Sequence, residues 1–264
     1  MSTPIMQVSH RAKKSLGQHF LRDPQISERI VRLLQCSADD AIIEIGPGPG
    51  ALTQILQQQV FTSLLLLEKD THWAAVRQKF ADTRTQAVLM DALTFDWKKL
   101  LADRPWKIIG NLPYNVASPL MWDIFSQAAG LRRAVFMVQK EVGQRLAAPP
   151  DSAHYGGLSV WVQSFVVPHW AFVVGPNAFS PPPKVDSAVV SFTPLAPEKW
   201  PADSEKLAWL IKICFQNRRK QLGSIFRQNG ILHLMEKLEA LGINPQRRPE
   251  TLSPKDFQQI LVKA

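Results

Sequence analysis

The stretch Ala41-Ile42-Ile43-Glu44-Ile45-Gly46-Pro47-Gly48-Pro49-Gly50 decides the fold, because a short apolar run ends there in a turn that holds three glycines. Such a run is typical of a strand buried on both faces of a sheet. Glycines directly after it let the backbone turn tightly into a helix and approach a ligand without a Cβ clash. We therefore expect a strand, a binding turn and a helix, although Gly-Pro turns also occur without a ligand.

Further apolar runs alternate with helical patterns in the first half of the chain. The pattern predicts strands at 41–45, 63–67, 86–90, 107–109 and 134–138, and helices at 24–34, 51–58, 71–79 and 118–127. Strands at this spacing indicate βαβ units and a parallel sheet. Three later runs follow without helices between them, so we expect strands at 158–165, 170–174 and 187–192 and an antiparallel finish. The fold class is α/β, a doubly wound, Rossmann-like sheet with an altered edge.

The end of the chain has a different character. Three prolines, Pro194, Pro197 and Pro201, precede a region with helical periodicity only, with helices expected at 205–216, 221–228, 231–241 and 254–262. Residues 197–264 carry twelve lysines and arginines against seven acidic residues, more than half of the net charge of +9. We predict a sheet domain over 1–196 and a small, basic, all-helical domain over 197–264.

Two carboxylates follow the next strands after the glycine turn. Glu68 ends the second expected strand, where an acidic side chain can bind both hydroxyls of a ribose, and Asp91 ends the third, where it can accept a hydrogen bond from an adenine amino group. The turn lacks the G-x-G-x-x-G spacing of pyrophosphate-binding loops. The pattern favours an adenosine cofactor without phosphates, such as S-adenosylmethionine.

A fourth strand end carries Asn111-Leu112-Pro113-Tyr114. This tetrapeptide offers an amide oxygen, a backbone carbonyl ahead of a proline, and a ring on which a planar base can stack. Together these groups can hold the exocyclic amino group of an adenine. Taken alone, Asn111 would also suit an ordinary turn and Tyr114 an ordinary core position.

Composition narrows the class of protein. With 264 residues, of which 45% are hydrophobic, the chain can bury a core, and the charge of +9 suits a polyanionic partner. Two scattered cysteines, Cys36 and Cys214, indicate neither a disulfide framework nor a structural metal site. No signal peptide or long apolar span is present, so we expect a cytoplasmic protein that does not bind membranes.

These motifs occur in an order that resembles one family, the small-subunit ribosomal RNA adenine-N6 dimethyltransferases of the KsgA type. The resemblance covers almost the whole chain and rests on 15–21, Glu44 to Gly50, Glu68, Asp91-Ala92, Asn111 to Tyr114, 140–146 with Tyr155-Gly156, 179–187 and 218–220. Two departures are modest. His19 stands where asparagine is usual, which puts one cofactor contact in doubt, and Ala117-Ser118 replaces a more common Ser-Thr pair.

The resemblance implies a class I methyltransferase fold, S-adenosyl-L-methionine as cofactor, and dimethylation of two adjacent adenines in the last hairpin of small-subunit (16S) rRNA. Its catalytic positions correspond to Asn111, Leu112, Pro113, Tyr114 and Phe179, the last of which either covers the base or anchors an edge loop. Its cofactor positions correspond to Gln18, His19, Leu21, Glu44, Gly46, Gly48, Gly50, Glu68, Lys69, Asp91, Ala92 and Asn111.

Basic side chains are the candidate contacts with RNA phosphates, although any one pair also fits a solvated surface. They are Arg11, Lys13, Lys14, Arg132, Arg133, Arg218, Arg219 and Lys220. We expect the partner to be small-subunit rRNA within the assembling subunit, and the protein to be a monomer. Two alternatives stay open: an antibiotic-resistance methyltransferase of large-subunit rRNA, and a ribosome-assembly factor whose catalysis is secondary. Leu112 and the 140–146 signature favour the small-subunit type.

Overall fold

A computed structural model describes residues 18–262 of the chain, so Arg11, Lys13 and Lys14 lie outside the described residues. The described chain divides into two compact units, one formed by 18–143 and 170–192 and the other by 144–169 and 193–262. The prolines predict one boundary after residue 196, whereas 144–169 groups with the C-terminal helices. The reason is packing, because α6 (Gly157–Gln163) contacts α7 (Ser204–Gln216) and α10 (Pro254–Leu261).

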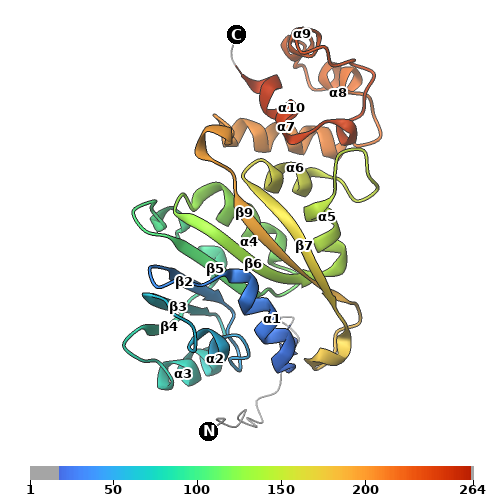
Figure 1. Cartoon of the computed structure of the whole chain (residues 1–264). Coiled ribbons are helices and arrows are strands. Elements are labelled where there is room, and N and C mark those ends of the chain that lie inside the picture. Colours follow the sequence, from blue (N-terminus) through green and yellow to red (C-terminus); the bar gives the residue numbers. More distant parts are fainter. Residues whose placement is uncertain (1–17, 263–264) are drawn as a thin grey trace. The chain divides into compact units, whose positions relative to one another are not determined.

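The first unit is built on a seven-stranded sheet with the spatial order β4-β3-β2-β5-β6-β9-β7 (Figure 1). The first five strands along this order are parallel, and β9 pairs antiparallel with β6. A separate pair joins β1 (Phe20–Leu21) to β8 (Phe179–Ser180). The sheet strands are β2 (Ala41–Ile45), β3 (Ser63–Glu68), β4 (Thr85–Leu89), β5 (Trp106–Asn111), β6 (Leu131–Gln139), β7 (Val166–Val174) and β9 (Ser187–Pro194). The expected doubly wound sheet with an antiparallel edge is confirmed.

Helices pack against both faces of this sheet. On one face Ile109 and Met137 join the core cluster that contains Ile30 and Val31 of α1, and on the other Phe125 of α4 packs against Phe136. Aspartates begin two helices: Asp23 accepts from two backbone N–H groups of α1 and Asp70 from two of α3. The helices are α1 (Pro24–Leu34), α2 (Thr53–Leu56), α3 (Thr71–Lys79) and α4 (Ala117–Gln127), with short 3-10 turns η2 (Ala92–Thr94), η3 (Trp97–Lys99) and η4 (Pro176–Ala178).

The second unit is helical, apart from the ends of β7 and β9. An aromatic cluster forms part of its core, in which Phe215 contacts Tyr155 and Phe257, and the Tyr155 hydroxyl donates to the Leu252 carbonyl at 2.8 Å. Helix α5 (Lys140–Ala147) crosses the division between the units. The remaining elements are η5 (Pro197–Lys199), α8 (Leu222–Gln228), α9 (His233–Ala240) and η6 (Pro249–Thr251). The expected C-terminal helices are confirmed.

The expected strand at 158–165 is wrong, because this segment forms α6. Ser159, Val160, Trp161 and Val162 of this helix are all buried. A helix buried on all sides shows no polar face, and its β-branched and aromatic residues then resemble a buried strand. The expected helix at 51–58 is also shorter, since only Thr53–Leu56 is regular.

Candidate active site

A cavity lies at the carboxyl ends of four neighbouring parallel strands, β4, β3, β2 and β5, where such sheets bind ligands. It brings together most of the positions that the sequence singles out. The lining residues are Gln18, His19, Phe20, Ile45, Gly46, Gly48, Leu67, Glu68, Lys69, Met90, Asp91, Ala92, Leu93, Asn111, Leu112, Pro113, Asn115, Val116 and Leu120. Of the predicted site residues, Leu21, Glu44, Gly50, Tyr114 and Phe179 do not line it.

The glycine turn has the conformation that its glycines predict. Gly46, Gly48 and Gly50 all have positive φ, a region that other residues rarely adopt. The Gly48 N–H donates to Oε2 of Glu68 at 2.9 Å, which ties the turn after β2 to the end of β3. A Cβ at Gly48 would lie 3.2 Å from the Phe20 ring. The turn is thus in contact with Glu68 through a hydrogen bond and with the Phe20 ring through packing.

Glu68 accepts backbone hydrogen bonds on both oxygens, from Gly48 and, at 2.8 Å, from the Asp70 N–H. Its burial raises the pKa of the carboxyl group. Each carboxylate oxygen can accept more than one hydrogen bond, so lone pairs remain beyond the two that are used. Glu68 can therefore position the turn and still accept hydrogen bonds from a ligand in the cavity.

Glu44 is buried beneath the turn and accepts a hydrogen bond from the Thr53 hydroxyl at 2.7 Å. Burial raises the pKa of Glu44 to about 7. Sequence reasoning missed its neighbour Arg77 on α3, which is only 6% exposed. Burial lowers the pKa of the Arg77 guanidinium, although the charges of Glu44 and Glu68 act to raise it. A Cβ at Gly50 would lie 2.1 Å from Nη1 of Arg77, so a side chain at position 50 would force the guanidinium to shift. A buried arginine at helical spacing gives no sequence signal for this contact.

Lys69 and Asp91 form an ion pair on the cavity wall, with Nζ 2.7 Å from Oδ2. The other carboxylate oxygen of Asp91 accepts from the Leu93 N–H at 3.1 Å. Burial favours a raised pKa for Asp91, but the hydrogen bonds from Lys69 and Leu93 and the Lys69 charge outweigh it and lower the pKa. Asp91 is thus an ionised acceptor at the end of β4.

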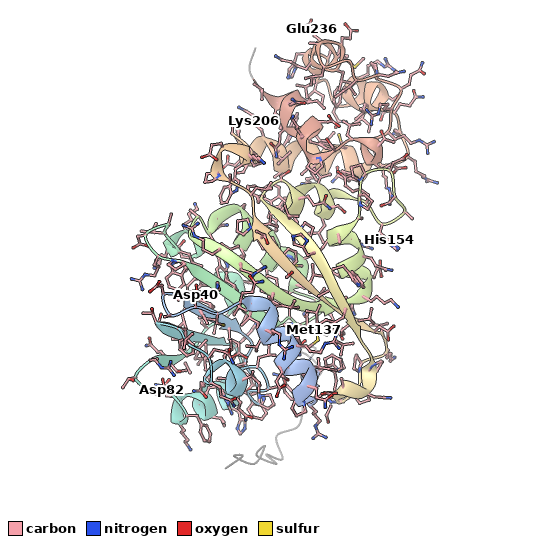
Figure 2. All side chains as sticks on the ribbon, in the orientation of Figure 1. Asp40, Asp82, Met137, His154, Lys206 and Glu236 are labelled. Carbon is pink, nitrogen blue, oxygen red and sulfur yellow. The ribbon has the colours of Figure 1, made fainter. Side chains whose placement is uncertain are left out.

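The Asn111 to Tyr114 motif begins at the end of β5. The Leu112 N–H donates to the carbonyl of Met137 on β6 at 3.0 Å, which extends the sheet by one bond (Met137 is labelled in Figure 2). The Asn111 Nδ2 donates to the His19 carbonyl at 2.9 Å. Among residues 18–262, no group donates to Asn111 Oδ1 or to the Leu112 carbonyl. Two acceptors therefore remain open where this motif lines the cavity.

The two aromatic candidates differ in their surroundings. Tyr114 stacks with His19 and its hydroxyl lies 2.9 Å from Oγ of Ser187, while burial raises the pKa of Tyr114. Phe179 is 4% exposed and belongs to the core cluster. It pairs with Leu21 in the β1 and β8 ladder, which accounts for the absence of both from the cavity. Anchoring an edge loop is the role that this position of Phe179 supports.

The predicted RNA contacts within the described residues are divided between the two units. Arg132 and Arg133 lie at the amino end of β6, whereas Asn111 lies at the carboxyl end of the neighbouring parallel strand β5. Within the second unit, Arg218 is bound to Glu250 at 2.6 Å and to the Ala153 carbonyl, whereas Arg219 is exposed with no hydrogen bond or ion pair to any described residue. Arg218 is thus engaged within its own unit.

Within 18–262, no cluster of three or more histidine, cysteine or carboxylate side chains is arranged to hold a metal ion. None of the helices in this part of the chain is both long and apolar enough to span a bilayer.

The sequence profile described as ribosomal RNA adenine dimethylase matches residues 9–263. This chain belongs to the ribosomal RNA adenine dimethylase family. The ribosomal RNA small subunit methyltransferase A of Nitratidesulfovibrio vulgaris is 55% identical over 250 residues, with 94% of each chain covered. The protein of the same name from Lawsonia intracellularis is 50% identical over 258 residues, which cover 97% of this chain and 94% of the relative.

Solved structures of similar fold are more distant in sequence. A dimethyladenosine transferase from Plasmodium falciparum has a TM-score of 0.81 at 24% identity, covering 92% of this chain and 96% of that one. The 23S rRNA methyltransferase ErmE has a TM-score of 0.69 at 21% identity, covering 91% and 97%. The dimethylase chain described here therefore has the class I methyltransferase fold, as its sequence predicts.

Proposed function

We propose that this protein transfers two methyl groups from S-adenosyl-L-methionine to N6 of each of two adjacent adenines in the 3'-terminal hairpin of 16S rRNA. The observation that carries the proposal is the pair of open acceptors, Asn111 Oδ1 and the Leu112 carbonyl, in the same cavity as the glycine turn. Small-subunit specificity is supported by the relatives, which at 50–55% identity bear the name ribosomal RNA small subunit methyltransferase A.

The residues around the glycine turn fit an adenosine cofactor. Glu68 has lone pairs left for ribose hydroxyls, and Asp91 stays ionised to accept from an adenine amino group. Gly46 and Gly48 bring bare backbone to the cavity wall. When bound, S-adenosylmethionine supplies a methyl group on a positively charged sulfur. The protein's part is to hold that methyl group in line with an incoming nitrogen.

Asn111 and Leu112 would make N6 reactive. The N6 lone pair of adenine is delocalised into the ring, so the amino group is a poor nucleophile. Two acceptors that draw its hydrogens out of the ring plane return lone-pair density to nitrogen, while Pro113 fixes the turn and Tyr114 offers a stacking face. Positioning and electrostatics then supply most of the rate, and the proton that N6 loses at each transfer passes to water rather than to a general-base side chain. Extrusion of the base into the pocket is required first.

The hydrogen count constrains the second transfer. Unmodified N6 has two hydrogens, the monomethyl intermediate one and the product none. A site with two acceptors loses one partner at each step, so we expect room for a rotated monomethylamine and weak binding of the product. Tight inhibition by dimethyladenine RNA would contradict this expectation.

RNA recognition would come from the shape of the folded subunit together with basic side chains. Arg219 and Lys220 are the exposed members of the 218–220 cluster. Arg132 and Arg133, at the amino end of β6, offer a second site. We expect the reaction to take place in the cytoplasm and the protein to act as a monomer.

The test is to incubate the purified protein with methyl-labelled S-adenosylmethionine and undermethylated small subunits, with large subunits in parallel, and to identify the nucleosides by mass. Dimethyladenosine confined to the small-subunit RNA is the expected result. Label in large-subunit RNA would instead assign the chain to the resistance methyltransferases. Subunit binding without label, together with maturation supported by a catalytically inactive variant, would favour an assembly factor.

A further inference from the structure

Ser187 ends the 179–187 signature and has no part in the methyl transfer proposed for Asn111 and Leu112. It is the first residue of β9, and its side chain is fully buried. Its Oγ lies 2.9 Å from the Tyr114 hydroxyl, so the two groups share one hydrogen bond. A buried hydroxyl costs free energy unless it is hydrogen-bonded, and this contact gives each hydroxyl a partner. Ser187 therefore binds the last residue of the target motif.

The hydrogen bond holds the Tyr114 ring at its rim. A tyrosine side chain turns about χ1 and χ2, and a bond at its outermost atom restrains both rotations. Stacking with His19 lets the two rings slide over each other, whereas the hydroxyl contact fixes one atom of the ring. The hydroxyl lies in the ring plane, so the contact covers neither face. Because aromatic pairs are favourable only in certain orientations, a ring fixed in this way is prepared for stacking.

Strand β6 supports both partners of this contact. On the side of β5, the Leu112 N–H donates to the Met137 carbonyl at 3.0 Å. On the side of β9, Ser187 pairs with Gln139 in the antiparallel ladder. Met137 and Gln139 are two residues apart on β6, so Tyr114 and Ser187 come from the two strands that flank its carboxyl end. The position of the Ser187 hydroxyl is thus set by the sheet.

A second contact holds the start of β9. The Lys140 N–H donates to the Asp186 carbonyl at 3.0 Å, and Lys140 Nζ lies 3.1 Å from Oδ2 of Asp186. Both side chains are partly exposed, so the ion pair adds little stability, and the backbone bond carries the pairing one residue beyond Ser187. All of these residues belong to the first unit. The 140–146 and 179–187 signatures therefore meet where Ser187 is placed.

We propose that Ser187 is a positioning residue for the target adenine, which acts through the Tyr114 hydroxyl. Its Oγ fixes the Tyr114 ring against the end of β6, so the stacking face keeps a constant place beside the open acceptors of Asn111 and Leu112. Tyr114 touches the base, and Ser187 does not. The assignment rests on the proposed function and deepens it, because it gives the 179–187 signature a part in holding the base.

A double-mutant cycle tests this route of action. Ser187→Ala and Tyr114→Phe each remove one hydroxyl and keep the carbon framework, and a third variant carries both substitutions. Ser191→Ala is the matched control, because Ser191 is another buried serine of β9 that lies outside this contact. For each variant we would measure thermal unfolding, the Kd of S-adenosylhomocysteine by calorimetry, and kcat and KM at saturating cofactor on undermethylated small subunits, with large subunits in parallel.

Ser187→Ala and Tyr114→Phe should each lower kcat by roughly three- to tenfold, the range for loss of one neutral hydrogen bond. The double variant should be no slower than the slower single variant, because both substitutions remove the same bond. The cofactor Kd of every variant, and the kcat of Ser191→Ala, should stay within about twofold of wild type, because they do not depend on this contact.

Unchanged kcat in Ser187→Ala would overturn the proposal, as would losses in the single variants that multiply in the double variant. If Ser187→Ala unfolds at the assay temperature, Tyr114→Phe decides in the same way, since it removes the same bond. Wild-type protein that methylates neither subunit would refute the proposed function itself. If wild type methylates large-subunit RNA, the cycle is measured on that substrate, because the contact concerns the base and not the subunit.

Discussion

The two ends of the cavity differ in how their polar groups are satisfied. At the end that we propose for the cofactor, called the cofactor end, Glu68 accepts two backbone hydrogen bonds and Asp91 is bound to Lys69 and Leu93. At the target end, Asn111 uses only its Nδ2 and the Leu112 carbonyl accepts from no residue of the described range. The cofactor end is organised by the protein itself, whereas the target end leaves its acceptors for a ligand.

This difference indicates an order of assembly. A site whose side chains are already held in place binds its ligand without first ordering them. A site with open acceptors is completed only when a donor arrives, and in the function that we propose this donor is the amino group of an extruded adenine. We therefore expect the cofactor to bind without RNA, and substitutions at the two ends to have separable effects.

Asn111→Ala should break the target end alone and give the largest effect. Loss of one of two acceptors should lower kcat by about 10²–10³-fold, by analogy with removal of one oxyanion-hole donor. The Kd of S-adenosylhomocysteine should stay within about threefold. Asn115→Ala is the matched control, since Asn115 also lines the cavity but lies outside the acceptor pair. Near-normal turnover by Asn111→Ala would refute the mechanism.

Gly50→Ala should break the cofactor end. The new Cβ would lie 2.1 Å from the Arg77 guanidinium, and alanine would have to adopt the φ of +92° that Gly50 has. We therefore expect a loss of about 2–4 kcal/mol in unfolding free energy, together with weaker cofactor binding. Gly230→Ala is the control for strain alone, because φ is +68° there and the surrounding space is open.

Adding Arg77→Ala to Gly50→Ala should relieve the clash and leave the strain. Urea unfolding of the two single variants and the double variant would give the coupling free energy between the residues. We expect the double variant to lose less unfolding free energy than the sum of the losses in the two single variants. Strict additivity would mean that the guanidinium does not support the turn.

The raised pKa of Glu44 predicts that the unfolding free energy depends on pH. Burial raises its pKa from 4.5 to about 7 in the folded protein, so between these values the folded state holds a proton that the unfolded chain releases. Unfolding free energy should therefore fall as pH rises through this window, by up to roughly 3 kcal/mol. Glu44→Gln keeps an acceptor for Thr53 and should flatten the slope, apart from the part due to Glu68. An unchanged slope, measured by urea unfolding at several pH values, would contradict the burial of an ionisable Glu44.

Arg219→Ala should have the smallest effect and should leave both ends of the cavity unchanged. Loss of one exposed phosphate contact should weaken subunit binding a few-fold and lower the slope of log affinity against log salt by about 1. Arg218→Ala is the contrasting variant, since it breaks the Glu250 pair and should lower the melting temperature. If the slope of log affinity against log salt were equal for wild type and Arg219→Ala, Arg219 would not contact the RNA.

The sheet and most of the cavity follow from the sequence because strand ends in a parallel sheet share one edge. Runs of apolar residues predict β2, β3 and β4, so the sequence places the glycine turn, Glu68 and Asp91 at three successive strand ends in one crevice. The helix at 158–165 could not be predicted, because the four consecutive buried residues 159–162 leave no helical period in the apolar pattern. Its place in the second unit depends on partners such as α7, far along the chain.

Other features depend on contacts that no motif encodes. Arg77 on α3 reaches Gly50 in the turn after β2, and Phe179 is drawn into the core by its pairing with Leu21. Likewise Arg218 and Arg219 are adjacent and alike in sequence, yet only Arg218 finds Glu250. Sequence identifies which side chains can act, and tertiary packing determines which of them stay available.

The most direct test of the separation between the two ends is to titrate the full chain with S-adenosylhomocysteine, with and without saturating small subunits. A cofactor end organised by the protein alone predicts stoichiometric binding without RNA and a Kd that changes by less than about threefold when subunits are present. Binding that appears only with subunits, or tightens tenfold or more, would contradict it.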